Sequence, residues 1–450
     1  MYTYSAIAYA VCPKSQISDM KYVDSGAGKL PLITLIAILA ISLTVNLPGL
    51  AISPIMGKLQ EIFPHASEFE IQLLTVLPNL VIIPFMLISG RLSVGHSQSM
   101  LVTVGLTVYL LAGVLYFFAG SMTELILISA LLGAGCGIVV PLAGGLIGQY
   151  FVGAARVKYL GWKSGISNFT IILGTLFVGL VAGRNWHLPF VVYMIPVIPL
   201  CLIPFLTGKY IDAHKIDPVS TPPYEPLKEP KITPSDPRSK ALKPTDVNFH
   251  FTGRIAFRLL MGVILIYFIT TYSSEVVSYY LPFTFKHYGL STTATGDATS
   301  LYFLTCTLAG FALPKTIRII GKDVLIYGAA IVMTALYLSG FFHHYAGYLF
   351  AVGIMGFAYG TMQPIIYDKA TYLAPTAQES SKYFSYVLAA NYIGISLTPV
   401  IVSGMSRLFG AQTDTNFSYI LNGSVMILLL IFMLWKRRTY SVEVNPALYR

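Results

Sequence analysis

The sequence predicts an all-α membrane protein with twelve transmembrane helices, arranged as two six-helix bundles that a cytoplasmic linker joins. Three observations support this fold class. The 450 residues are 55% hydrophobic and only 11% charged, whereas an average globular protein is about 25% charged. Uncharged stretches close to or above the roughly 20 residues that cross a bilayer follow one another along the chain. A polar, proline-rich segment divides these stretches into six and six.

The charged residues are too few to cover a soluble protein of this length, and the mean hydropathy is +0.69. This composition excludes a soluble enzyme, a nucleic-acid-binding protein and a disordered chain. The first six apolar stretches are 30–57, 71–90, 92–123, 125–155, 164–183 and 185–208. The second six lie at about 255–283, 298–314, 324–342, 346–367, 383–406 and 415–435.

Five segments follow from these stretches. We expect a cytoplasmic N-terminal extension at 1–29, an N-terminal bundle at 30–208, a Pro-rich linker at 209–253, a C-terminal bundle at 254–438 and a cytoplasmic tail at 439–450. Prolines among alternating charges are typical of an extended tether rather than a packed domain. Met20 is a more ordinary start for such a chain, so the sequence leaves open whether residues 1–19 are expressed.

The basic residues predict the orientation. An even number of spans places both termini on one side, and Lys and Arg concentrate in cytoplasmic loops. With a cytoplasmic N-terminus, 25 of the 29 basic residues lie inside, and Lys58, Arg184, Lys286 and Arg407 lie outside. We therefore expect a multi-pass protein of the cell membrane with both termini and the linker in the cytoplasm. The net charge of +10 then requires no polyanionic partner.

The two halves show weak internal similarity, as expected of a duplicated fold. At an offset of 223, Gly133, Gly137, Pro141 and Asn168 match Gly356, Gly360, Pro364 and Asn391. At an offset of 228, Pro54 and Lys58 match Pro282 and Lys286. The order of the matches predicts a parallel duplication of the six spans.

Short motifs at these places resemble the major facilitator superfamily. Gly90-Arg91-Leu92 follows the second span, where the family has its GxLaDRxGR signature, although Val94 and Gly95 replace the Asp and Arg. The resemblance covers the chain from about Leu30 to Arg438 and implies the family's fold and secondary transport without a cofactor, by a protein that we expect to be a monomer.

The motifs of drug-exporting members of that family are only partly present. Gly165, Gly174 and Gly183 match positions of the antiporter motif, but Val178 and Gly179 replace its Gly-Pro pair. In the fourth span Ser129 takes the place of the usual arginine. The stretches 61–64 and 71–74 resemble a branch from Gram-positive bacteria, which implies conjugated bile-salt transporters or exporters as relatives.

Polar groups deep in the spans are the candidate functional residues, with helix–helix contacts as the alternative role for each. Glu275 is the most prominent, because other carboxylates fall near the ends of their spans, and Tyr272 and Tyr279 lie three and four residues from it. The sequence leaves two roles open for Glu275. It is either a cavity carboxylate that binds a proton or cargo, or a structural carboxylate that contacts another helix. We expect Asn46, which aligns with Ser274 at the offset of 228, to bond cargo or bridge two helices.

The remaining candidates are amides and tyrosines. Asn168 and Asn391 correspond in the repeat, which favours a shared architectural role over cargo binding. We expect Gln363 and the tyrosines of spans eight and ten to form one wall of a cavity. The tyrosine rings would make this wall apolar, and their hydroxyls would make it polar at its surface. Lys163, near the start of span five, is expected to extend to the cytoplasmic surface. No arginine falls in mid-span, which disfavours phosphate-ester cargo.

These features predict a function. No HExxH, GxSxG or paired intramembrane aspartate motif is present, so we expect no enzyme, no cofactor and no metal site. An aromatic lining with one acid suits bulky amphipathic organic molecules, with organic anions such as conjugated bile salts favoured. The alternatives are a proton-coupled multidrug efflux antiporter and a non-transporting subunit or channel. The expected partners are the lipid bilayer, the organic substrate, and protons or a counter-transported anion.

Overall fold

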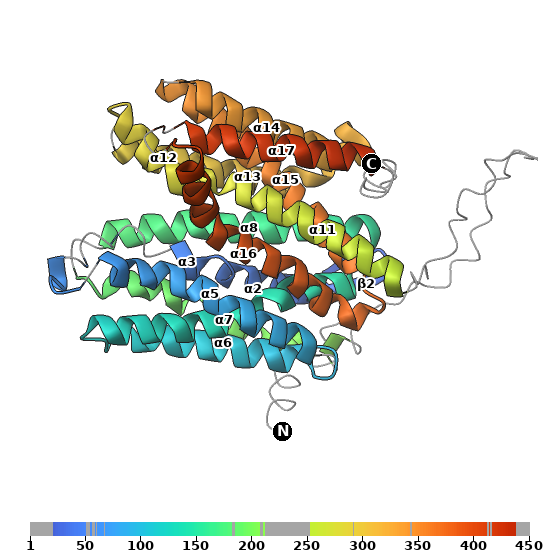
Figure 1. Ribbon diagram of the computed structural model, residues 1–450. Helices are drawn as coiled ribbons and strands as arrows, with labels where there is room; N and C mark the ends of the chain where they lie inside the picture. Colours follow the sequence, from blue (N-terminus) through green and yellow to red (C-terminus); the bar gives the residue numbers. More distant parts are fainter. Residues whose placement is uncertain are drawn as a thin grey trace, which may run out of the picture.

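The predicted spans form helices in the computed structural model (Figure 1). The structure describes residues 21–50, 55, 59, 61–66, 68–181, 185–207, 210–211, 253–290, 292–342, 344–411, 414 and 416–437. The predicted linker and C-terminal tail therefore lie almost wholly outside the described residues, as do Lys58 and Arg184.

The first half contains spans one to six. The chain enters through a hairpin of β1 (Tyr22–Asp24) and β2 (Lys29–Pro31). Span one is α2 (Leu32–Ile41), η2 (Ser42–Thr44) and α3 (Leu47–Leu50). The next four are α5 (Glu68–Leu92), α6 (Gln98–Leu115), α7 (Met122–Tyr150) and α8 (Gly153–Val181). Span six is η4 (Leu188–Met194), α9 (Val197–Cys201) and η5 (Ile203–Leu206).

The second half repeats this order. Span seven is α11 (Gly253–Ser274) followed by α12 (Val276–His287), with a turn at Glu275. Spans eight to twelve are α13 (Thr292–Ile320), α14 (Val324–Phe341), α15 (Tyr345–Tyr372), α16 (Ser380–Leu408) and α17 (Phe417–Trp435). Short 3-10 turns, η7 (Gly321–Asp323) and η8 (Ala377–Glu379), precede α14 and α16.

Eight helices of the described part are long and apolar enough to cross a membrane. Shorter apolar helices occur in the first, second and sixth spans, at Leu32–Thr44, Val76–Leu92 and Leu188–Cys201, and in the first and sixth the helix breaks. Pro48 follows the 3-10 turn of span one, and prolines recur at 189, 196, 199 and 204 in span six, where each removes a backbone donor and limits helix length. The all-α membrane class is thus confirmed.

The packing of glycines shows the duplication directly. A Cβ on Gly137 of α7 would lie 2.7 Å from the carbonyl oxygen of Ile82 in α5. A Cβ on Gly360 of α15 would lie 2.7 Å from the carbonyl oxygen of Cys306 in α13. In each half the absence of a side chain lets the fourth helix approach the backbone of the second. The offset of 223 therefore relates residues in the same structural position.

The halves meet along two sets of helices. Figure 1 shows the first half in blue to green and the second in yellow to red, with α8 and α16 lying between them. Helix α8 packs on α13 and α15, and α16 packs on α5 and α7. Gly161 and Gly310 touch backbone to backbone, since a Cβ on either would lie within 2.6 Å of the other's carbonyl oxygen. This contact places the polar side chains of α8, α15 and α16 in the interior.

The hairpin at residues 22–31 is a feature that the sequence did not predict, because its strands are only three residues long. Gly26 adopts a φ of +81° in its turn, a conformation that favours glycine. The amide of Val152 donates a hydrogen bond of 2.9 Å to the carbonyl of Ser25. The segment expected to be a simple extension is thus docked on the α7–α8 connection.

Candidate functional site

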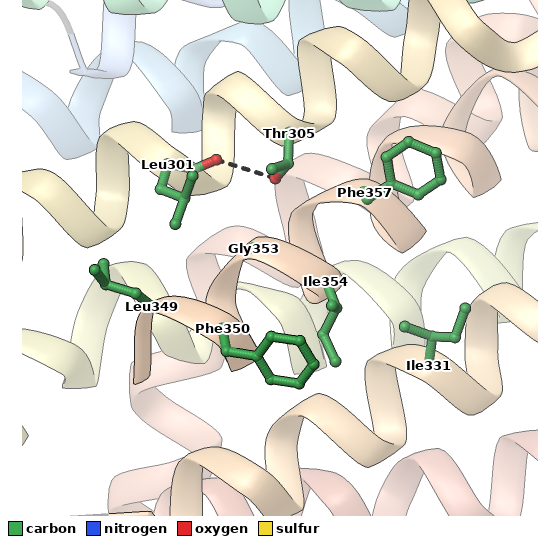
Figure 2. Close-up of a pocket in the computed structure, with 8 residues that line it drawn as sticks. All are labelled: Leu301, Thr305, Ile331, Leu349, Phe350, Gly353, Ile354 and Phe357. Atoms are coloured by element: carbon green, nitrogen blue, oxygen red, sulfur yellow. Dashed lines mark hydrogen bonds between the residues drawn. The ribbon is translucent and has the colours of Figure 1, made fainter. Parts of the chain in front are cut away.

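A groove of about 620 Å³ opens on the second half between α13, α14 and α15 (Figure 2). Its lining is apolar except for Thr305, whose hydroxyl donates a hydrogen bond of 3.0 Å to the carbonyl of Leu301. Phe350 and Phe357 on its rim are exposed, as expected of a surface that faces lipid. The groove offers no polar group that could orient an amphipathic substrate.

The polar interior lies elsewhere, at the contact between the halves. Ser164 of α8 donates a hydrogen bond of 3.0 Å to Oε1 of Gln363 on α15. Nε2 of Gln363 donates to the hydroxyl of Tyr267 on α11 at 3.0 Å, and that hydroxyl lies 2.7 Å from the hydroxyl of Tyr367. We call these four residues the tyrosine chain. It extends from the first half into the second and is uncharged throughout.

Two amide clusters flank this chain, one in each half. Nδ2 of Asn391 donates to the hydroxyl oxygens of Thr271 at 2.9 Å and of Tyr359 at 3.1 Å. In the first half, Nδ2 of Asn46 donates to Oδ1 of Asn168 at 3.4 Å. Each cluster joins the first helix of its half to the fifth. The contact to the amide of the fifth helix is made by Asn46 in the first half and by Thr271 in the second.

Glu275 lies half-buried at the turn between α11 and α12. Its carboxyl group is within electrostatic range of the hydroxyls of Tyr279, Tyr302 and Tyr359. Tyr272, the other predicted neighbour, stacks instead on Phe268 with ring centroids 6.3 Å apart. The structure thus brings Glu275 close to Tyr279, whereas the ring contact shown for Tyr272 is to Phe268.

Tyr267 was not among the predicted site residues, although the sequence carries a signal for it. Tyr267, Thr271 and Glu275 are spaced four residues apart, which places them on one face of a helix. The tyrosine chain, the Asn391 cluster and Glu275 therefore line one face of α11, in that order toward its C-terminal end.

The prediction that Lys163 extends to the cytoplasmic surface is wrong. Its side chain does not extend to the surface but is only 2% exposed. The ammonium lies 4.6 Å from the centre of the Tyr367 ring and 5.3 Å from the centre of the Phe384 ring. The helices of the second half cover α8 at this point, so the route to the surface that an isolated helix would offer is closed.

Close contacts between the halves gather at the end that the basic residues predict to be cytoplasmic. Nε of Arg156 lies 2.5 Å from Oδ1 of Asp368, and both side chains are mostly buried. We call this pair the latch.

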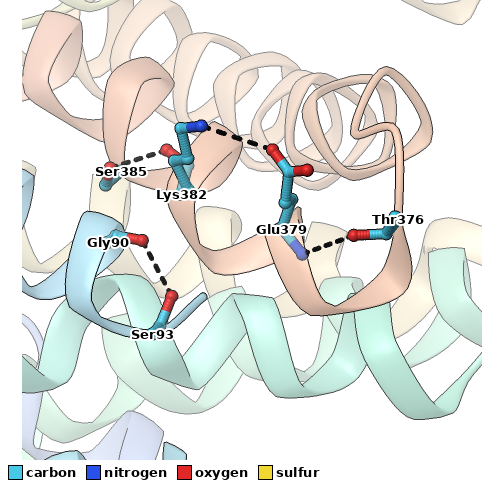
Figure 3. A network of polar contacts seen from close by, with 6 residues as sticks. All are labelled: Gly90, Ser93, Thr376, Glu379, Lys382 and Ser385. Carbon is cyan, nitrogen blue, oxygen red and sulfur yellow. Dashed lines mark hydrogen bonds and ion pairs between the residues drawn. The ribbon is translucent and has the colours of Figure 1, made fainter. Parts of the chain in front are cut away.

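Small residues continue the same closed end. Gly90 on α5 packs against Ser385 on α16, and Gly145 on α7 packs against Ser381. In Figure 3 the end of α5, with Ser93 bonded to the carbonyl of Gly90, lies beside the start of α16. There Lys382 pairs with Glu379 at 3.3 Å.

Breaking the latch should open this end. We expect Arg156→Ala to increase alkylation of a cysteine at Ser381 by an impermeant reagent in inside-out vesicles by roughly tenfold, because it leaves Asp368 unpaired in a partly buried place. The measurement uses protein whose four native cysteines are replaced.

The charge-swapped double variant, Arg156→Asp with Asp368→Arg, should return labelling toward the original rate. Unchanged labelling in Arg156→Ala would show that the latch does not hold the end closed.

Two repeated six-helix halves with polar side chains between them are the architecture of a secondary transporter. The sequence profile described as "Major Facilitator Superfamily" matches residues 32–266 and 263–448. The chain belongs to this family, which confirms the resemblance in its motifs and makes it a transporter rather than an enzyme.

Several known proteins are similar to this chain. The multidrug transporter protein MdtP of Bacillus subtilis (strain 168) is 30% identical over 153 residues. That match spans 34% of this chain and 27% of the length of the relative. The human organic anion transporter MFSD10 (TETRAN) has a TM-score of 0.63 at 13% identity, over 89% of this chain and 98% of its own.

The structure of the proton:xylose symporter XylE bound to 6-bromo-6-deoxy-D-glucose gives a TM-score of 0.64 at 19% identity, over 93% of this chain and 98% of its own. At these identities the two structures show a shared fold.

Proposed function

We propose that the protein is a secondary active transporter that moves bulky amphipathic organic molecules across the cell membrane by alternating access, with organic anions such as conjugated bile salts as the favoured class. The observation that carries this proposal is the tyrosine chain, which combines aromatic rings with neutral hydrogen-bonding tips at the contact between the halves. Such a surface suits a large apolar body with a few polar groups. The organic anion transporter of the same fold is consistent with this class.

The candidate residues take roles within this proposal. Gln363 presents an amide at the junction of the halves, where a substrate would replace its bonds to Ser164 and Tyr267. Asn46, Asn168 and Asn391 fix the first helix of each half to the fifth. Tyr279 and Glu275 line the opposite end of the path, and Tyr272 stacks on Phe268 within α11.

The test is counterflow in proteoliposomes that contain the purified protein, with labelled taurocholate, a panel of hydrophobic drugs and a sugar. We expect exchange of taurocholate and none of the sugar. Exchange of cationic drugs but not of taurocholate would contradict transport of organic anions and favour a multidrug transporter. Absence of all exchange in folded protein would favour a channel or a subunit of an assembly.

A proton-coupled multidrug efflux antiporter is the second candidate. Glu275 is a membrane-embedded carboxylate with tyrosine hydroxyls around it, an arrangement suited to proton binding. The multidrug transporter of Bacillus subtilis supports the same candidate over the part that matches. A dependence of drug exchange on an imposed pH gradient would distinguish it from an anion carrier.

We propose the predicted orientation as well, with the linker at 209–253 and both termini in the cytoplasm. We expect single cysteines placed in the linker to react with an impermeant reagent only after the cells are opened, because nine basic residues between 209 and 258 favour the cytoplasmic side. Labelling from outside intact cells would reverse the orientation. A cysteine at Gly120, in the connection between α6 and α7 that the proposed orientation places outside the cell, is the matched control.

A further inference from the structure

Lys163 is a buried cation whose aromatic neighbours both come from the opposite half. It lies on α8 of the first half, while Tyr367 on α15 and Phe384 on α16 cover its ammonium. Among the described residues no carboxylate forms an ion pair with it. A cation–π contact is weaker than the hydration that a buried ammonium gives up. A charge kept at such a cost within a membrane indicates a functional site.

The acids on neighbouring elements are engaged elsewhere. Asp368 pairs with Arg156 and Glu379 with Lys382 at the rim of the closed end. Glu275 follows Tyr267 by eight residues at the end of α11, which corresponds to about 12 Å of helix rise from the level of the tyrosine chain. Lys163 is therefore a cation between the latch and the substrate path that has no anion of the described chain as its partner.

We propose that Lys163 binds the carboxylate or sulfonate of an amphipathic anion when the cytoplasmic end is open. Separation of the halves carries Tyr367 and Phe384 away from Lys163 and exposes its ammonium, which has three donors. The same movement frees the hydroxyl of Ser164 from Gln363, so a second donor lies next to the cation. Tyr267 and Tyr367 are then available to the apolar body of the substrate.

This arrangement also accounts for the rings over the ammonium in the closed end. When the carrier returns without cargo, the two aromatic faces take the position of the anion and allow the charge to remain buried. The inference rests on the proposed function, because it names the residue that makes the carrier selective for anions. Its test must therefore separate loss of anion selectivity from absence of anion transport.

The experiment measures binding of two probes to the purified full-length protein. Taurocholate is the anionic probe, and the aminoethyl amide of cholic acid is a cation with the same steroid body. We expect Lys163→Met, which keeps the length of the side chain, to raise the Kd for taurocholate at least about tenfold and to leave the Kd for the amide within about twofold. Lys163→Arg keeps the charge and should bind taurocholate within about threefold of the original protein.

Lys158→Met is the matched control. Lys158 lies on the same helix and its ammonium also contacts aromatic rings, 5.3 Å from the centre of Tyr159 and 5.1 Å from that of Trp162. Lys158 lies at the rim, so Lys158→Met should leave the Kd for taurocholate and the Kd for the amide unchanged. Where Lys163→Met does not fold, Lys163→Gln keeps a donor without the charge and answers the same question.

Three results would overturn the inference. Equal affinity of the original protein and Lys163→Met for taurocholate would do so and leave the proposed function intact. Binding of the cationic amide alone by the original protein would overturn both. Failure of every neutral variant to fold, while Lys158→Met folds, would make Lys163 a structural residue.

Discussion

Replacing Gly145 with valine should abolish transport in protein that still folds. A Cβ at this position would overlap Oγ of Ser381 and lie 2.6 Å from its Cα, so the closed end cannot form around a larger side chain. Overpacking of this kind costs about 1–3 kcal/mol in a packed core. Because the contact joins two halves that separate in the proposed alternating-access mechanism, the cost falls on the closed state alone. We expect counterflow to fall at least about tenfold, with an unchanged elution profile in detergent.

Two glycine variants serve as controls for this result. Gly133→Val wedges α7 against Pro78 within the first half, where a Cβ would lie 2.6 Å from the carbonyl oxygen of Pro78, and should reduce the amount of folded protein. No described residue lies within 4 Å of a Cβ added at Gly404, so Gly404→Val should be neutral. Full activity of Gly145→Val would show that the closed end is not required for transport.

Removing the charge of Glu275 should abolish transport driven by a pH gradient while exchange of bound cargo remains measurable. Glu275→Gln keeps the shape of the side chain beside Tyr279, Tyr302 and Tyr359 but cannot bind or release a proton. A purely structural carboxylate would behave differently, because breaking a buried pair costs roughly 3–5 kcal/mol and would reduce folded protein.

The measurement compares gradient-driven uptake, counterflow and yield of folded protein for each variant. Glu379→Gln is the control, since it removes a carboxylate that pairs with Lys382 at the rim. Gradient-driven transport at the original rate in folded Glu275→Gln protein would remove Glu275 from the coupling mechanism. The tyrosine chain and Lys163 would then remain as candidates for substrate binding.

The fold could be predicted because each span is a local property of the sequence. Charge-free runs fix the helices, and the glycine pattern of α7 and α15 fixes which helices pack closely within each half. Asn168 and Asn391 were predicted to share an architectural role from the repeat alone. In the structure Asn168 contacts Asn46 and Asn391 contacts Thr271, and the shared role stays a prediction.

The contacts between the halves could not be predicted in this way. Arg156 and Asp368 are 212 residues apart, and nothing in the pattern of either span indicates that they meet. Lys163 was expected at the surface because a lysine near the end of an isolated helix extends to water. Its burial depends on α15 and α16, which are contributed by the other half.

The latch is charged and the tyrosine chain is neutral, so these two contacts between the halves respond differently to salt. Ions in solution screen a pair at the rim over about 8 Å at physiological ionic strength, but they do not reach hydrogen bonds within the membrane. Rising ionic strength on the latch side therefore weakens the more exposed Lys382–Glu379 pair most and the largely buried Arg156–Asp368 pair less, and it leaves Ser164–Gln363 and Tyr267–Tyr367 unchanged. The resting population of the carrier should therefore shift toward the state with the latched end open as the salt concentration on that side rises.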